Sequence, residues 1–348
     1  IYSDGVSVTV VGSKFIDNQA PNGGSDIYSD ERVTVMANDY DGKTTYNSSE
    51  IVGNPIINII GPFAELQLII NLTPENGVLY LPNKKFTAIA NDTTLNINKN
   101  ITIEGNGAIL DADNRFRIMK IDYGVNVTLK NLTFINGNAT GGVIDGYGGA
   151  IYSEGNVTVK DSTFINTTAK LSGGAIYGSG DVIVTDSIFN HTIAQEGGAI
   201  STYPSRASCI FNVTGSIFNN NVADYGGAIC NEGPMSIVNS IFNNTRADYG
   251  GAIYSTNEIN IKNSIFNNNI AQEGGAIYGN DLFMSNTTFI NTTSTRYGGA
   301  ININGGIVSV SNTTFKDIIS GDNGGAINAR GANVTVSNST FNNTTSTG

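Results

Sequence analysis

The sequence predicts an all-β chain wound into a right-handed parallel β-helix, a solenoid with coils of about 24 residues and a short N-terminal helical cap. Two observations predict this fold class. The phrase Gly-Gly-Ala-Ile occurs eight times between Gly148 and Ile327, at intervals of 24 to 29 residues. A phenylalanine ahead of an Asn-rich turn follows the same interval from Phe164 to Phe341. Such self-similarity is typical of stacked units that cannot each bury an apolar face alone.

Each coil is expected to contain two or three short strands separated by turns. In the repeat that starts at Gly148, Val157 and Val159 alternate with polar residues, and Ile151 and Phe164 lie in other β-prone runs. Equivalent residues should then stack about 4.8 Å apart, so that the Ile and Phe positions form interior columns. The Gly pairs are expected at a corner that needs positive φ or leaves no room for a side chain.

Asparagine is expected to form a further column, two places after each phenylalanine. Stacked amides can hydrogen-bond to one another and can satisfy buried turn backbone, so we expect an internal ladder at a bend. Its members are Asn136, Asn166, His191, Asn220, Asn244, Asn268, Asn291, Asp317 and Asn343.

The chain is expected to divide into three parts. Residues 1–38 read as short degenerate coils that end a preceding block, and residues 39–62 as a linker or excursion. Residues 63–348 then form the main β-helix, with an amphipathic cap helix at 63–72 and regular repeats from Gly148. Both ends read as interrupted repeats, which predicts a segment of a longer chain. A complete chain with such ends would be expected to stack end to end.

The composition argues against several classes of partner. The formal net charge is −11, and the 18 Lys and Arg residues are scattered, which argues against nucleic acid. No apolar run is long enough to span a bilayer. Many Asn-X-Ser/Thr sequons predict a secreted, partly glycosylated protein. The candidate sites are Asn47, Asn91, Asn138, Asn156, Asn286, Asn312 and Asn333.

No catalytic residue, metal site or cofactor is expected. Parallel β-helices also carry polysaccharide lyases and hydrolases, and Asp111 and Asp113 with Arg115 and Arg117 come nearest to a calcium or catalytic site. A turn explains them better. The single histidine, His191, occupies the Asn column and is expected to be structural. A zinc site has little support without a second His or a Cys/His cluster.

Cys209 and Cys230 lie in neighbouring coils. The repeat register places Cys209 opposite Gly233, so a disulfide with Cys230 depends on the extra residues near Ser201–Ser208, in the 29-residue coil that starts at Gly197. These extra residues are expected to form a loop that projects from the wall. Loops of this kind are where solenoids place function.

Tyrosines form the most prominent exposed feature that the repeat predicts. One column follows the Ile and is interrupted by Ser201, Cys230, Asn302 and Asn328, and a second column precedes the Gly pair. Together with nearby carboxylates these rings could bind glycan or protein, or they could simply stack to protect a corner. The candidate binding residues are Tyr152, Tyr177, Tyr254, Tyr278, Tyr225, Tyr249 and Tyr297, with Tyr147 beside them and with Asp224, Asp248, Glu196 and Glu273 as the carboxylates.

The repeats resemble two families of β-helix surface proteins. The stretches Asn100–Gly107 and Val125–Phe134 resemble the opening coils of adhesin-like proteins of methanogenic archaea. The Gly-Gly-Ala-Ile phrase is similar to chlamydial polymorphic membrane proteins, whose Phe-X-X-Asn motif is complete here at Phe15/Asn18, Phe218/Asn221 and Phe266/Asn269. The resemblance implies exposure at the cell surface and a role in adhesion, and it supplies no catalytic residues.

We therefore expect an extracellular, non-enzymatic, adhesin-like protein of the cell surface. The expected partners are a surface glycan or protein of another cell, or copies of the chain itself. One alternative is a structural protein of the cell envelope or of a filament, and a second is a polysaccharide lyase or hydrolase.

Overall fold

The structure is a computed structural model that describes residues 62–141 and 146–348 in full, and only the backbone of short strands within residues 1–61. It divides into two compact units. One comprises Ile1–Leu72 with Thr87–Leu95, and the other Thr73–Phe86 with Asn96–Gly348. The boundaries expected from the sequence stay a prediction.

The first unit contains short parallel strands in three small sheets. Tyr2 pairs with Tyr28, and Ile27 with Ile51, at the repeat interval seen elsewhere in the chain. Short strands are therefore also present within residues 39–62, the stretch expected to be a linker or excursion. The sheets are β1 (Tyr2–Ser3), β4 (Ile27–Ser29) and β7 (Ile51–Gly53); β2 (Val8–Val11), β5 (Val33–Met36) and β8 (Ile57–Ile59); and β3 (Lys14–Phe15) with β6 (Asp39–Tyr40).

The helix expected at 63–72 is present as α1 (Pro62–Leu72). Proline suits the first position of a helix, because that position needs no amide donor. The side chains of Phe63, Leu66 and Ile70 are buried. Asp92 Oδ1 accepts a hydrogen bond from the amide of Ala64, 3.0 Å away, and so satisfies one donor of the first turn. The capping role of this helix stays a prediction.

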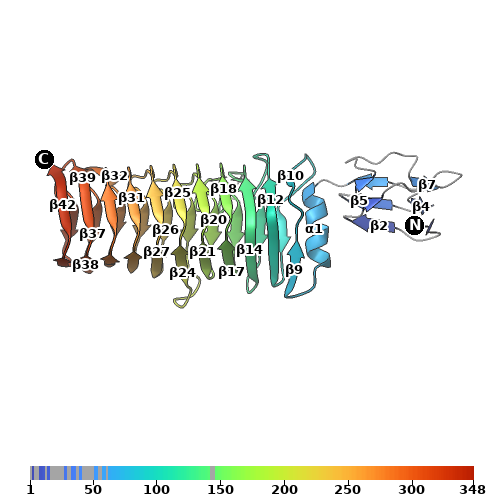
Figure 1. The fold of residues 1–348 in the computed structure, drawn as a ribbon, viewed down its shortest axis with the longest axis horizontal. Helices are drawn as coiled ribbons and strands as arrows, with labels where there is room; N and C mark the ends of the chain where they lie inside the picture. The colour runs from blue at the N-terminus through green and yellow to red at the C-terminus, as the bar shows by residue number, and fades with distance from the viewer. Residues whose placement is uncertain are drawn as a thin grey trace. The chain divides into compact units, whose positions relative to one another are not determined.

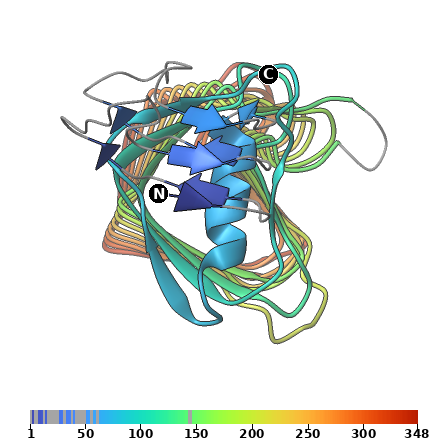
Figure 2. The same cartoon turned by 90° about the vertical axis from the view of Figure 1, so that its right-hand side faces the viewer.

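The second unit is a parallel β-helix of about eleven turns with coils of about 25 residues, which confirms the predicted fold class (Figure 1). Its strands pair only with the equivalent strands of neighbouring coils, in parallel register. Three faces result, named here by their inward residues, and Figure 2 shows them surrounding the interior.

The isoleucine face is a ten-stranded sheet. Its strands are β11 (Leu95–Ile97), β13 (Met119–Ile121), β16 (Ile151–Ser153), β20 (Ile176–Gly178), β23 (Ile200–Thr202), β26 (Ile229–Asn231), β29 (Ile253–Ser255), β33 (Ile277–Gly279), β37 (Ile301–Asn304) and β40 (Ile327–Arg330).

The valine and phenylalanine faces belong to one bent sheet, because β12 (Ile101–Asp111) and β14 (Asn126–Ile135) run through both. The valine face also has β9 (Gly77–Tyr80), β17 (Asn156–Lys160), β21 (Val182–Thr185), β24 (Phe211–Thr214), β27 (Met235–Val238), β30 (Ile259–Lys262), β34 (Leu282–Ser285), β38 (Ile307–Ser311) and β41 (Asn333–Ser337).

The phenylalanine face has the strands that follow these along the chain. They are β10 (Lys85–Thr87), β18 (Thr163–Ile165), β22 (Ile188–Asn190), β25 (Ile217–Asn219), β28 (Ile241–Asn243), β31 (Ile265–Asn267), β35 (Thr288–Ile290), β39 (Thr314–Ser320) and β42 (Thr340–Ser346). Short strands follow at β15 (Asn138–Ala139), β19 (Thr168–Ala169), β32 (Ile270–Glu273) and β36 (Thr293–Tyr297).

Residues in the left-handed conformation make the corners of each coil. Asp161 and Asn166 have φ of 49° and 53°, and each lies where the inward alternation skips one residue. The residue after each of them, Ser162 or Thr167, is buried. Asn and Asp adopt this conformation more readily than other residues with a side chain. They therefore let one strand turn into the next without losing the inward register.

The predicted Asn ladder lies on the outside of the β-helix, so the expectation of an internal ladder was wrong. The amide of Asn268 donates to Asn244 Oδ1 at 3.2 Å, and both side chains are exposed. The left-handed backbone turns these side chains outward, and the next residue points inward instead. The interior position is taken by Asn221 or Asn269 in two coils, and by threonine in others.

A buried serine column completes the interior of this bent sheet. Ser240 Oγ accepts the amide of Ser216 at 3.3 Å and donates to the carbonyl of Val238 at 3.0 Å. The same pattern recurs in neighbouring coils. Each hydroxyl therefore satisfies a backbone donor that would otherwise be buried without a partner.

The phenylalanine column forms one continuous stack, as predicted. Phe266 lies between Phe242 and Phe289, with ring centroids 4.7 and 4.8 Å apart and the planes within 7° of parallel. The ring is fully buried. The Ile column is equally buried from Ile151 to Ile301 and pairs coil to coil, as Ile253 does with Ile277.

The Gly pairs meet both conditions that the sequence suggested, one at each glycine. Gly250 has φ of 64°, and a Cβ there would lie 2.0 Å from the carbonyl oxygen of Ile253. At Gly251 a Cβ would lie 2.1 Å from the carbonyl oxygen of Gly275 in the next coil. The first glycine is therefore needed for the turn, and the second for close approach of neighbouring coils.

Candidate binding surface

The two tyrosine columns run side by side along the isoleucine face and its edge. Strand register aligns Tyr152 with Tyr177, and Tyr254 with Tyr278, in the column that follows the Ile. The column before the Gly pair aligns Tyr225 with Tyr249. All of these side chains are half-buried. The structure thus brings most of the predicted binding residues onto one wall.

The rings form two patches. The first joins Tyr147, Tyr152 and Tyr177, and Tyr152 lies parallel to Tyr177 with centroids 5.4 Å apart. The second patch joins the rings of Tyr225, Tyr249, Tyr254 and Tyr278, whose centroids lie 5.2 to 5.5 Å apart where they are in contact. Rings of the two columns therefore contact one another within each patch, and the Arg117 guanidinium lies 5.0 Å from the Tyr152 ring centroid.

Three of the phenols in these patches stay neutral far above physiological pH. Burial raises the pKa of Tyr152, Tyr177 and Tyr254 to about 12. Burial also raises the pKa of Tyr278. Neutral phenols can donate and accept hydrogen bonds, so each patch presents apolar ring surface together with polar hydroxyls.

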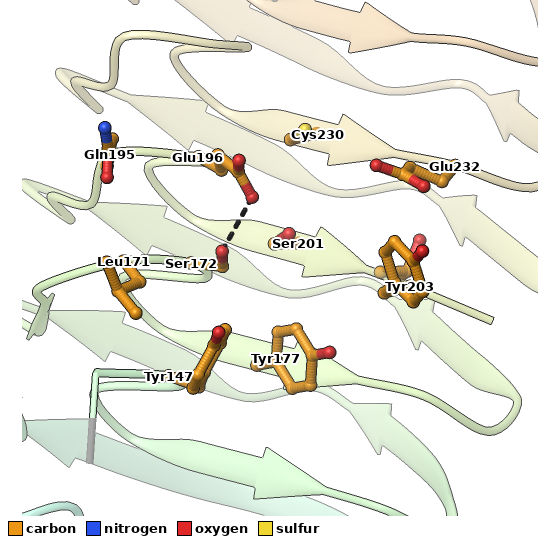
Figure 3. A pocket seen from close by; sticks show the side chains of 11 residues that line it. Tyr147, Leu171, Ser172, Tyr177, Gln195, Glu196, Ser201, Tyr203, Cys230 and Glu232 are labelled. Atoms are coloured by element: carbon orange, nitrogen blue, oxygen red, sulfur yellow. Dashed lines mark hydrogen bonds between the residues drawn. The ribbon is translucent and has the colours of Figure 1, made fainter. Parts of the chain in front are cut away.

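A pocket lies between the two patches (Figure 3). In the coils beside the pocket, Ser201 and Cys230 replace tyrosine in one column. Ser172 and Glu196 replace it in the other column. The smaller side chains leave a hollow of about 340 Å³. Tyr147, Tyr177, Tyr203, Glu232, Gln195 and Leu171 are among the residues around it.

The loop predicted at residues 201–208 borders this pocket. The loop joins β23 to β24 and is the yellow projection beside β24 in Figure 1. The amides of Tyr203 and Ser205 donate to the carbonyls of Gly178 and Ser179 in the preceding coil, at 3.0 and 2.8 Å. These bonds hold Tyr203 at the pocket, although its side chain is 57% exposed.

Two carboxylates, Glu196 and Glu232, lie at the pocket. Glu196 Oε2 accepts a hydrogen bond from Ser172 Oγ at 2.8 Å. Within the part of the chain that the structure describes, neither Glu196 nor Glu232 is paired with Lys or Arg. Burial and the nearby charge of Glu196 raise the pKa of Glu232.

The remaining predicted residues are distributed along the same wall. Tyr297 pairs in register with Glu273, and the Arg296 guanidinium lies 5.1 Å from the Tyr297 ring centroid. Arg296 also forms an ion pair with Glu273 at 2.9 Å. Asp224 and Asp248 are exposed at the neighbouring turn. Tyr297 therefore lies outside both patches.

The two cysteines are not bonded in the structure. Cys230 is buried in the tyrosine column, and its thiol pKa is raised, first by burial. Cys209 Sγ lies 3.6 Å from the carbonyl oxygen of Ser179. The inserted loop therefore directs Cys209 toward the preceding coil, whereas Cys230 follows in the next one.

The acidic pair considered as a calcium or catalytic site is held by basic neighbours. Asp111 forms an ion pair with Lys85 at 2.7 Å, and Asp113 with Arg115 at 3.1 Å. Burial alone would raise the pKa of Asp111, but hydrogen bonds from Lys85, the Asp113 amide and Asn136 lower it. Arg117 donates to the carbonyls of Tyr147 and Gly148. These partners favour a structural turn.

The glycosylation candidates stay a prediction. Asn91, Asn286, Asn312 and Asn333 are exposed, and Asn138 and Asn156 are half-buried. The Asn156 amide donates to Asn126 Oδ1 at 2.8 Å, a bond that a glycan on this nitrogen would compete with. Asn47 lies outside the described residues.

Sequence reasoning missed the pocket and Tyr203. The interruption of the tyrosine column at Ser201 and Cys230 was visible as a signal, because two small residues in neighbouring coils must leave space where rings stand elsewhere. Tyr203 gave no such signal. It belongs to the insertion, which the repeat register cannot place.

Comparison with known families supports the repeat assignment. Residues 215–232 and 263–280 match the model of the Chlamydia polymorphic membrane protein repeat. This chain is a β-helix repeat protein. The two matched segments contain Phe218/Asn221 and Phe266/Asn269, and Asn221 and Asn269 are fully buried.

No curated protein matches the chain. Within the described residues, no helix has both the length and the apolar character needed to cross a bilayer.

Proposed function

We propose that the chain is an extracellular, non-enzymatic, adhesin-like protein that attaches to a glycan or protein of another cell through the tyrosine wall, the surface that carries the two tyrosine patches. The observation that carries this proposal is the pair of interlocked tyrosine patches on one face of the β-helix. Rigid aromatic rings supply contact area at low entropic cost, and tyrosine is enriched where binding energy is concentrated. The resemblance to archaeal adhesin-like proteins and the chlamydial repeat match support a location at the cell surface.

Attachment should depend on the second patch. Replacing Tyr254 and Tyr278 by alanine removes two of its four rings, and we expect binding to a glycan array or to target cells to weaken by about tenfold or more. The matched control replaces Tyr80 and Tyr123, which are 68% and 72% exposed and lie outside the tyrosine wall. Unchanged binding of the Tyr254/Tyr278 variant would contradict this dependence and exclude the second patch from attachment.

The two other classes of function predict different observations. A filament-forming protein would assemble into long fibres under the electron microscope, whereas an adhesin would remain as separate particles. A lyase or hydrolase would release unsaturated or reducing ends from acidic polysaccharides. We expect no sustained turnover, because Asp111 and Asp113 are engaged by Lys85 and Arg115.

A further inference from the structure

The pocket between the tyrosine patches is formed where several features of the repeat change together. Ser201 and Cys230 replace tyrosines in adjacent coils, and the inserted loop adds Tyr203 at the same level. The side chains of Thr202 and Asn231 are hydrogen-bonded across the two coils and are buried. A Cβ at Gly233 would lie 2.9 Å from Pro204 Cγ, so the loop packs closely on the next coil. Hydrogen bonds and close packing therefore hold the residues of both coils that border the hollow.

The pocket favours positive charge. Glu196 and Glu232 both border it, and no lysine or arginine is among its lining residues. Burial first, and then repulsion from the negative charge of Glu196, raises the pKa of Glu232. A cation between them would remove this repulsion and would give both carboxylates a partner.

The aromatic side of the pocket suits the same kind of ligand. Tyr147, Tyr177 and Tyr203 present three rings, and cations are attracted to the faces of aromatic rings. Ser201 and Gln195 add neutral hydrogen-bonding groups. A volume of about 340 Å³ lies at the lower end of the range for small-ligand sites, enough for one sugar ring or one amino-acid side chain.

We propose that this pocket binds a protonated primary amine carried on a compact body, as in an amino sugar or a lysine side chain. The amine lies between Glu196 and Glu232, and the body contacts the tyrosine rings. The inference rests on the proposed function in one respect: it takes this wall of the β-helix as the surface that meets a ligand. It adds the chemical class of the ligand that this surface would bind.

The direct test is titration of the whole chain with matched small probes, followed by NMR chemical shifts or calorimetry. Glucosamine and Nα-acetyl-lysine methylamide carry the amine, whereas N-acetylglucosamine and Nα,Nε-diacetyl-lysine methylamide lack its charge. We expect the amines to bind at least about tenfold more tightly than their acetylated counterparts. The stronger of the two amines identifies the source. Equal binding of charged and neutral probes, or no binding of either amine, would overturn the proposal.

Two variants locate the binding. Ser201→Tyr restores the tyrosine column and fills the hollow, and Glu196→Gln/Glu232→Gln removes its charge. We expect each to weaken amine binding by about tenfold or more. The control Asp186→Asn/Glu258→Gln removes two exposed charges outside the lining, and should leave it unchanged. Equal losses in the control would show that net charge alone attracts the amine and would refute the pocket.

The pH dependence gives a readout that a purely structural effect would not produce. Amine binding should weaken as the pH falls through the raised pKa of Glu232, because protonation removes one of the two negative charges. This fall should be absent in the double Gln variant, and its persistence there would contradict the role of these carboxylates. Amine binding and cell attachment are separate measurements. Ser201→Tyr retains Tyr254 and Tyr278, so failure of the pocket can be distinguished from failure of the adhesin proposal.

Discussion

Single residues with positive φ turn the backbone at the corners of each coil. Two kinds of residue occupy these positions: Asn or Asp between strands, and glycine at the first position of the Gly pair. At the strand corners, Asn and Asp adopt positive φ at a lower cost than other residues with a side chain, and their side chains turn outward. At the first position of the Gly pair the side chain would point into the carbonyl of the following Ile. Only glycine satisfies the second condition.

Comparing Gly250→Ala with Gly331→Ala separates the cost of positive φ from the cost of the steric clash. Both positions have positive φ, 64° and 68°, but a Cβ at Gly331 meets nothing within 4 Å. We expect Gly331→Ala to lower the free energy of unfolding by roughly 1 kcal/mol, and Gly250→Ala to lower it by roughly 3 kcal/mol or more. Urea unfolding followed by circular dichroism measures both. Similar losses would mean that backbone conformation, and not the clash, explains the Gly column.

The phenylalanine stack should dominate the contribution of single residues to stability. Phe266→Ala removes two ring contacts and leaves a cavity, so we expect a loss of about 3–5 kcal/mol. Its neighbour Ile265 points outward and is 39% exposed. Ile265→Ala should therefore cost about 1 kcal/mol or less in the same urea experiment. A comparable loss at both positions would contradict the inward and outward assignment.

At the scale of the repeated element, the buried Asn of Phe-X-X-Asn links one coil to the one before it. Asn221 Oδ1 accepts hydrogen bonds from the amide and hydroxyl of Thr192, at 3.1 and 2.9 Å. Asn221 Nδ2 donates to the carbonyl of Phe189 at 3.3 Å. The buried Asn of the motif therefore has a structural role, because its side chain bonds its own coil to the preceding one.

Asn221→Leu should be costly, because the amide and hydroxyl of Thr192 lose their acceptor inside the β-helix. We expect a loss of about 1–3 kcal/mol in the free energy of unfolding. Asn221→Thr should cost less, because threonine occupies the equivalent buried position in neighbouring coils. Thermal unfolding of the two variants tests this order, and a more stable Leu variant would contradict it.

The sequence could predict the elements well and the site only in part. The intervals between Gly-Gly-Ala-Ile phrases place Ile253 over Ile277, and the Phe spacing places each ring in its stack. The Asn ladder was misplaced because counting by two from Phe242 makes Asn244 an inward residue, and only the left-handed corner reverses it. The pocket depends on where an insertion packs, and Tyr203 has no counterpart in other coils from which to infer its position.

At the scale of the whole β-helix, each coil contacts mainly its neighbours, so whole coils should be removable. Deleting residues 250–273 joins Tyr249 to Gly274 and preserves the register, because Gly250 and Gly274 make the same bond to the residue before the next Gly pair. We expect a folded protein with a smaller urea m-value, since less surface is exposed on unfolding. Deleting only residues 250–261 breaks the register and should prevent cooperative folding. Equal behaviour of the two deletions would contradict a nearest-neighbour solenoid.

The tyrosine wall should make stability sensitive to alkaline pH. The pKa of Tyr152, Tyr177 and Tyr254 is raised from 10.0 to about 12, so their contribution is complete below pH 10 and is lost as the pH rises toward 12. The melting temperature should fall across this window. Replacing the three residues by phenylalanine should reduce the fall, whereas an unchanged fall in that variant would assign it to other groups.

The orientation of the backbone hydrogen bonds has a mechanical consequence. They run from coil to coil, along the direction in which the coils are stacked, as between Ala252 and Ala276. Tension applied along the stack would load the bonds of one coil at a time, and each released coil of 24 residues would add roughly 80 Å of extended chain. Under a steady pull the β-helix would lengthen in small successive steps, and the coils still wound would remain intact between them.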